Sequence, residues 1–165
     1  MFYRRVHPRL GDGDQFLVGR KATEADHSRG RAGGDYQVEE DMVRIHNITR
    51  DQTLANRAWE AVTRAERRKG LLGRDSLDKG EGLVIRGCIG IHSFFMRFAF
   101  DVAFVDREGT VMHTIRRMKP WRISRIVPRA AGVVELPAGV LKATGTQVDD
   151  RLRFDRDYRG GIQDS

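Results

Sequence analysis

The sequence has a single cysteine, Cys88, and no apolar run long enough to span a membrane as a helix. One cysteine excludes an intramolecular disulfide, which agrees with a protein from a reducing compartment. The longest apolar patch near the N-terminus is Phe16–Val18, which is far shorter than the hydrophobic region of a signal peptide. We therefore expect a cytoplasmic protein that makes no contact with a membrane.

Several signatures of catalysis and of metal binding are also missing. The chain contains no P-loop, no HExxH helix, no GxSxG turn and no CxxC pair. Cys88, His92 and Met96 are soft ligand types, but their spacing matches no recognised metal pattern. We predict no metal and no cofactor.

Residues 1–41 and residues 42–165 differ in charge and in pattern. The first part holds 7 Lys/Arg and 8 Asp/Glu, whereas the second holds 23 and 15, so the net charge of +7 comes from the second part. Residues 11–41 show no sustained period of 2 or 3.6 and have little apolar surface to offset chain entropy. We predict a disordered extension over residues 1–41, with Met42 as an alternative initiator, a single domain over 42–155 and a polar tail over 156–165.

From residue 42 onward, short apolar runs separated by turn residues indicate mostly β-structure. Asp106–Gly109 is predicted to be a hairpin turn, with Gly109 where a positive φ is needed. The predicted strands cover residues 43–48, 53–62, 83–87, 88–96, 100–105, 110–115, 130–136 and 150–155.

Two short helices are expected between these strands. Thr63 and Glu66 have the spacing of a capping box, which predicts a helix to about Leu72 that contains Gly70 and ends at Gly73. Residues 137–145 predict a second helix, with a proline at its first position and a glycine as its stop. Seven or eight short strands with two short helices predict an α+β fold, mainly antiparallel β, curled into a small, partly closed barrel.

Five segments follow one another in the order of a known family. They are Arg68–Arg74 (RKGLLGR), Gly80–Leu83 (GEGL), Cys88–Asp106, Glu135–Gly139 (ELPAG), and Gly145 with Asp150 and Arg151. Together they resemble the bacterial and archaeal domain of unknown function 192 over residues 43–154. The resemblance implies a small β-barrel-like α+β domain. It implies no reaction, because no activity is established for that family.

The stretch from Gly87 to Val111 is apolar and aromatic, yet it carries four polar groups: Cys88, His92, Arg97 and Asp101. If residues 88–96 form a strand, Cys88, His92, Phe94 and Met96 line one face of it. A carboxylate within an apolar run needs a partner, or its pKa should rise. The candidate partners of Asp101 are backbone N–H groups and three arginines, Arg68, Arg74 and Arg97.

These polar groups allow three interpretations. The first is structural, with His92 and Asp101 as satisfied core groups that fix a corner and the strand register. The second is a polar, ligand-binding spot in the barrel mouth of a non-catalytic, monomeric module, which binds an unknown small molecule or protein. The residues of that spot are His92, Asp101, Arg68, Arg74 and Arg97. The third is an enzyme with Cys88 as nucleophile, His92 as base and Asp101 as the group that orients it.

A basic segment lies further along the chain, where Glu108 is the only acidic residue between Arg107 and Arg129. The interpretation that we prefer is a solvated hairpin face whose Trp121 packs into the core. The alternative is a surface for weak contact with a polyanion or a single-stranded nucleic acid. Its residues are Arg116, Arg117, Lys119, Trp121, Arg122 and Arg125.

Overall fold

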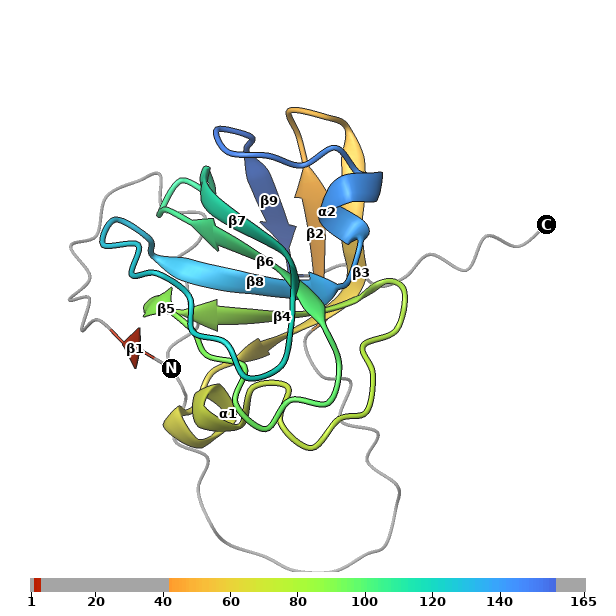
Figure 1. The fold of residues 1–165 in the computed structure, drawn as a ribbon. Helices are drawn as coiled ribbons and strands as arrows, with labels where there is room; N and C mark the ends of the chain where they lie inside the picture. Colours follow the sequence, from red (N-terminus) through yellow and green to blue (C-terminus); the bar gives the residue numbers. More distant parts are fainter. Residues whose placement is uncertain (1, 4–41, 157–165) are drawn as a thin grey trace, which may run out of the picture.

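The computed structural model describes residues 2–3 and 42–156 of the chain. A seven-stranded sheet in the order β7-β6-β8-β4-β3-β2-β9 forms the body of the protein, and β1 and β5 form a separate pair (Figure 1). The strands are β1 (Phe2–Tyr3), β2 (Val43–Asn47), β3 (Gln52–Ala61), β4 (Glu81–Arg86), β5 (Cys88–Gly90), β6 (Phe100–Val105), β7 (Val111–Met118), β8 (Gly132–Pro137) and β9 (Leu152–Asp155). The helices are α1 (Arg64–Lys69) and α2 (Val140–Ala143).

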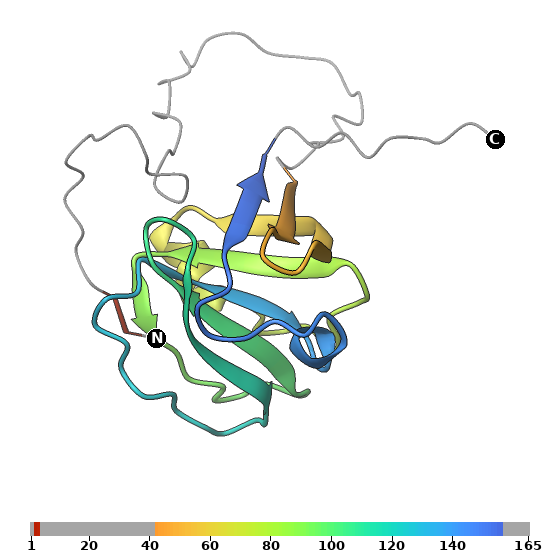
Figure 2. The same ribbon diagram turned by 90° about the horizontal axis from the view of Figure 1, so that it is seen from above.

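The large sheet curls until its two edge strands approach each other at one end (Figure 2). All neighbouring strands are antiparallel except β3 and β4, which run parallel. The turn before β7 meets the start of β9 through an isolated bridge between Thr110 and Arg151. The backbone N–H of Leu152 also donates to the Gly109 carbonyl at 2.8 Å. The predicted fold, mainly antiparallel β in a partly closed barrel with two short helices, is confirmed.

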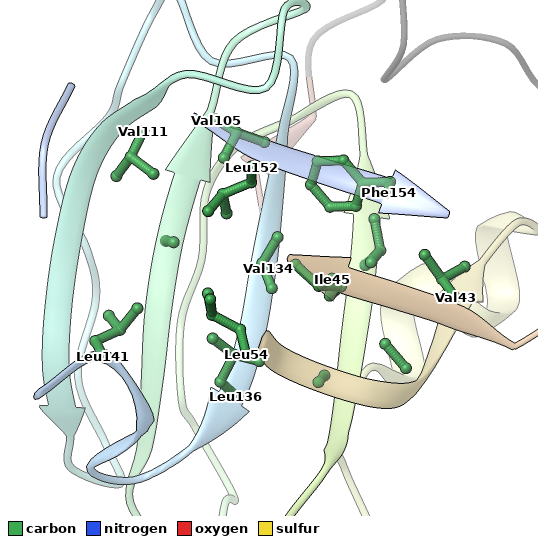
Figure 3. Packing of buried hydrophobic residues seen from close by; sticks show 14 of the residues in the cluster. Val43, Ile45, Leu54, Val105, Val111, Val134, Leu136, Leu141, Leu152 and Phe154 are labelled. Atoms are coloured by element: carbon green, nitrogen blue, oxygen red, sulfur yellow. The ribbon is translucent and has the colours of Figure 1, made fainter. Parts of the chain in front are cut away.

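Buried side chains form two clusters, one on each face of the curled sheet. The inner cluster includes side chains from both edges of the sheet, such as Val111 of β7 and Phe154 of β9, and therefore lies inside the curl (Figure 3). The outer cluster includes Phe100, Val102 and Phe104, which alternate along β6 with inner-face residues. Because both faces are covered, every residue of β6 is buried.

The region between β5 and β6 differs from the prediction. The predicted strand over 88–96 is wrong beyond Gly90, because β5 ends there and residues 91–99 form a loop. Phe95 in this loop has a φ of 64°, which is incompatible with an extended strand. The predicted common strand face of Cys88, His92, Phe94 and Met96 is therefore not formed.

The helices begin and end slightly differently from the prediction. The capping box of Thr63 and Glu66 is present, with both of its hydrogen bonds. The helix nevertheless ends at Lys69 rather than near Leu72, because Gly70 has a φ of 48° and serves as the C-cap. The second helix starts later than predicted, since Pro137 is the last residue of β8 and Gly139 is the N-cap of α2.

Phe2–Tyr3 fall within the segment predicted to be disordered, yet they form β1 and pair with β5. Residues 1, 4–41 and 157–165 lie outside the described residues, so the predicted disordered extension, the alternative start at Met42 and the polar tail stay predictions. The described residues contain no helix that is both long and apolar enough to cross a membrane.

Closure of the barrel predicts unequal costs for two glycine substitutions. A Cβ at Gly109 would lie 2.3 Å from the Leu152 carbonyl oxygen, whereas a Cβ at Gly145 would meet nothing within 4 Å. Both glycines have positive φ, so each alanine variant should lose about 1–2 kcal/mol of unfolding free energy from backbone strain. Gly109→Ala should lose about 1–3 kcal/mol more from overpacking, measured by urea unfolding. Equal losses would contradict a close approach of the two edges.

Candidate functional site

Asp101 is fully buried near the start of β6, and its carboxylate accepts three backbone hydrogen bonds. The N–H of Arg117, at the end of β7, donates to Oδ1 at 2.8 Å. The N–H groups of Gly139 and Leu141 donate to Oδ2 at 3.0 and 2.8 Å. Gly139 is the N-cap of α2 and has no side chain to cap it, so Asp101 satisfies the first turn of this helix from another strand.

Of the candidate partners predicted for Asp101, the backbone N–H groups are confirmed, whereas the pairing with an arginine of the Arg68–Arg74 segment, or with Arg97, is wrong. Arg74 bonds to Glu81 at 2.8 Å and lies over the Trp59 ring, and Arg97 bonds to Asp75 at 2.5 Å. Arg68 is exposed on α1. The Asp101 side chain points to the inner face of the sheet. The backbone N–H groups at the end of β7 and at the start of α2 lie there, and they donate to its carboxylate.

Cys88, His92 and Asp101 are not joined to one another by any hydrogen bond among the described residues. The Cys88 thiol is buried in the outer cluster, donates to the Gly90 carbonyl at 3.2 Å, and has its pKa raised to about 12 by that burial. Burial lowers the pKa of His92, whose Nδ1 is enclosed without a partner in the described part of the chain. This arrangement offers neither a thiolate nor a base in contact with it.

Glu135 is a buried polar residue that the sequence analysis missed as a site candidate. It lies in the middle of β8 on the outer face, opposite Leu83 of β4 and Val102 of β6, and is 5% exposed. No hydrogen bond or ion pair reaches its side chain from the described residues. Desolvation by these apolar neighbours raises the pKa of Glu135 to about 8. The only sequence signal was a carboxylate within a strand that is otherwise apolar.

Two loops beside the outer cluster are joined by hydrogen bonds, and we call residues 91–98 and 119–127 the paired loops. The buried Ser93 hydroxyl donates to the Lys119 carbonyl at 2.7 Å and accepts from the Arg122 N–H at 2.9 Å. The Ser124 hydroxyl accepts from the Ile91 N–H at 2.9 Å. Two buried serines therefore hold the loops in register, although no motif in the sequence marked them.

The paired loops carry four aromatic rings in contact, which we call the aromatic run. The His92 ring stacks on Phe94 with centroids 5.0 Å apart, and Phe94 lies 6.0 Å from Trp121. Trp121 meets Phe95 edge to face at 4.8 Å. Phe95 is 70% exposed and Trp121 is 55% exposed, so the preferred prediction that Trp121 packs into the core is wrong.

Backbone strain is concentrated around the same loops. Of the five described non-glycine residues with positive φ, three are Phe95 (64°), Arg117 (51°) and Trp121 (62°). A bulky aromatic residue in this region costs about 1–2 kcal/mol, and the surrounding structure must enforce it. The hydrogen bond from the Trp121 N–H to the Ser93 carbonyl, at 2.9 Å, is one such constraint.

Basic residues flank Trp121 of the aromatic run along the chain. Residues 109–134 contain no aspartate or glutamate. The basic residues of the predicted polyanion surface are all exposed, and none takes part in an ion pair among the described residues. They are Arg116, Arg117, Lys119, Arg122 and Arg125. The described part of the chain holds no group of three or more His, Cys, Asp or Glu placed to bind a metal ion.

Comparison with known proteins identifies the family. The family DUF192, described as an uncharacterized ACR, matches residues 45–154, and the chain belongs to this family. This agrees with the resemblance of its five sequence segments.

Curated relatives from archaea share part of the sequence. A UPF0127 protein of Pyrococcus abyssi is 39% identical over 66 residues, which are 39% of this chain and 54% of the relative. A UPF0127 protein of Pyrococcus furiosus is 38% identical over 68 residues, which are 40% of this chain and 56% of the relative. The match thus spans about half the length of these relatives.

Two solved structures have a similar fold. One, a protein of unknown function from Novosphingobium aromaticivorans, has a TM-score of 0.59 at 20% identity and covers 67% of this chain and 82% of its own. The other, titled a putative transcription regulator from Sinorhizobium meliloti, has a TM-score of 0.58 at 24% identity and covers 68% and 91%. At these identities the likeness concerns the fold alone.

The hydrogen bonds of Asp101 predict a large cost for Asp101→Asn. Both oxygens of the Asp101 carboxylate accept hydrogen bonds from backbone N–H groups. In the asparagine variant the NH₂ group replaces one of these oxygens, so a donor would face a donor and at least one hydrogen bond would be lost. We expect a loss of about 2–4 kcal/mol in the free energy of unfolding, measured by urea melts. Asp75→Asn removes an exposed carboxylate that bonds to Arg97, and should cost less than about 1 kcal/mol. Equal costs for the two variants would contradict the role of Asp101.

Glu135 predicts a stability that falls as the pH rises. Between the ordinary pKa of 4.5 and the folded-state pKa of about 8, the unfolded chain has released this proton and the folded chain retains it. The free energy of unfolding should therefore decrease by about 1.4 kcal/mol per pH unit across this range, through this group alone.

The measurement compares urea melts from pH 5 to 8 for the parent chain and for Glu135→Gln. The variant should lose this slope because glutamine does not titrate, whereas Glu108→Gln, at an exposed turn, should retain it. Parallel pH profiles for the parent and Glu135→Gln would show that Glu135 is already ionised in the folded protein.

Proposed function

We propose that this domain is a non-catalytic binding module whose binding surface is the aromatic run with the basic residues around it. The observation that carries this proposal is the exposed, strained contact between Phe95 and Trp121. Exposed aromatic residues in a sparsely populated backbone conformation lower stability, and such strain is concentrated at functional sites.

The groups considered for catalysis support the same proposal. The two oxygens of Asp101 are occupied by backbone donors, and the Cys88 thiol is buried and protonated at neutral pH. Neither group has the accessibility that a nucleophile or its orienting carboxylate requires. His92, the remaining member of the predicted polar spot, contributes its ring to the aromatic run.

The rigidity of the paired loops also favours binding. Ser93 and Ser124 fix the backbone of both loops, so the rings are held in place before any partner arrives. A surface organised in advance loses less conformational entropy when it binds. Small molecules, proteins and polyanions remain the partner classes predicted from the sequence.

Genetic complementation tests this proposal in a strain that lacks the protein and shows a measurable defect. Cys88→Ser should restore the parent phenotype, because the thiol has no chemical role. The double variant Phe95→Ala, Trp121→Ala should fail to restore it, although it stays folded by thermal melting. The matched control Ile48→Ala, which removes an exposed apolar side chain from the β2–β3 turn, should restore the phenotype.

The opposite pattern would contradict the proposal. If a folded Cys88→Ser chain fails and the aromatic double variant succeeds, the domain is a cysteine-dependent enzyme. Labelling of the native protein at Cys88 by an electrophilic thiol probe at neutral pH would point the same way.

A further inference from the structure

We propose that the partner of this module is a single-stranded nucleic acid, whose bases stack on the aromatic run and whose phosphates meet the basic side chains around it. This inference rests on the proposed function, because it names the partner of the same surface. It goes further by assigning a role to the rings and a different role to the charges.

The aromatic run offers exposed ring surface on which bases can stack. Its ring centroids are 5.0, 6.0 and 4.8 Å apart, so four π-systems follow one another without a gap. Trp121 and Phe95 expose more than half of their surface at one end of this run. Unpaired bases stack on such rings with little dependence on sequence, whereas bases within a duplex are already stacked on each other.

The charges complement a phosphate backbone. Arg116, Arg117, Lys119, Arg122 and Arg125 are exposed within ten residues of sequence that contain no carboxylate. Among the described residues none of them has an acidic partner, so their charge is available to an external anion. Guanidinium groups bind phosphate oxygens well because their donors are planar and paired.

The backbone of the paired loops joins the two features. The Arg122 N–H donates to the Ser93 hydroxyl, and the Trp121 N–H donates to the Ser93 carbonyl. Residues 119–127, the basic member of the paired loops, are therefore fixed against residues 91–98, which carry Phe94 and Phe95. A single-stranded nucleic acid that lies along this junction would contact aromatic rings and cationic side chains together. This combination is found in proteins that bind single strands.

The test uses the full chain and a fluorescein-labelled oligo-dT strand of about 12 nucleotides, with binding followed by fluorescence anisotropy. Trp121→Ala and Phe95→Ala should each weaken binding by about 5- to 100-fold, since each removes one stacking partner. Ile48→Ala removes an exposed apolar side chain from another turn and should leave the affinity unchanged.

Salt dependence separates the role of the charges from the role of the rings. The logarithm of the association constant should fall linearly with the logarithm of salt concentration, by about 0.7 per phosphate contacted. Arg122→Gln should make this slope shallower by about that amount. Trp121→Ala should lower the affinity but leave the slope unchanged. Lys79→Gln, an exposed basic residue in the loop before β4, should leave both affinity and slope unchanged.

Three results would overturn the inference. The first is equal affinity for the single strand and for the matching duplex, because a duplex has no free bases to stack. The second is unchanged binding by the folded double variant Phe95→Ala, Trp121→Ala. The third is no oligonucleotide binding by the parent chain, in which case Trp121-dependent binding to phosphatidylglycerol vesicles would identify the partner as an anionic lipid surface.

Failure of this inference can be told apart from failure of the proposed function. If the oligonucleotide does not bind but complementation still requires Phe95 and Trp121, the binding surface stands and only the partner class is wrong. If complementation does not require them, the proposed function fails irrespective of what the oligonucleotide does.

Discussion

The rest of this structure depends on the three hydrogen bonds that backbone N–H groups donate to the Asp101 carboxylate. This carboxylate lies on the inner face of the curled sheet and accepts hydrogen bonds from the end of β7 and from the start of α2. One buried charge thus satisfies three backbone donors that apolar side chains would leave unpaired. The hydrogen bond from the Arg117 N–H also fixes the end of β7, so residues 119–127 of the paired loops start from a defined position.

The two faces of the sheet make different contributions. The inner cluster is closed by contact between the two sheet edges, and Gly109 allows their backbones to approach. The outer cluster is covered mainly by loops and retains two polar groups, the Cys88 thiol and the Glu135 carboxyl. Burial raises the pKa of both groups, so each is neutral over part of the pH range in which its exposed counterpart would be charged.

Local patterns in the sequence predicted local structure well. The capping box of Thr63 and Glu66 and the hairpin turn before β7 depend on residues within a few positions of one another. The need of Asp101 for a partner was also predictable, because a carboxylate inside an apolar run cannot stay unpaired cheaply. The identity of that partner was not predictable, since the donors lie 16, 38 and 40 residues further along the chain.

The same limit explains the error over Trp121. A large aromatic side chain indicates burial unless something holds it outside the core, and here Ser93 and Ser124 fix the loops that carry Phe95 and Trp121 through hydrogen bonds spanning 29 and 33 residues. Folding alone would favour a relaxed loop with Trp121 and Phe95 packed inside. The chain instead maintains positive φ at both residues and keeps their rings in water, at a cost in stability. The burial of Asp101 is offset by three hydrogen bonds within the fold, whereas no contact among the described residues offsets the exposure of the two rings, and this contrast is why we place the proposed binding surface at the rings.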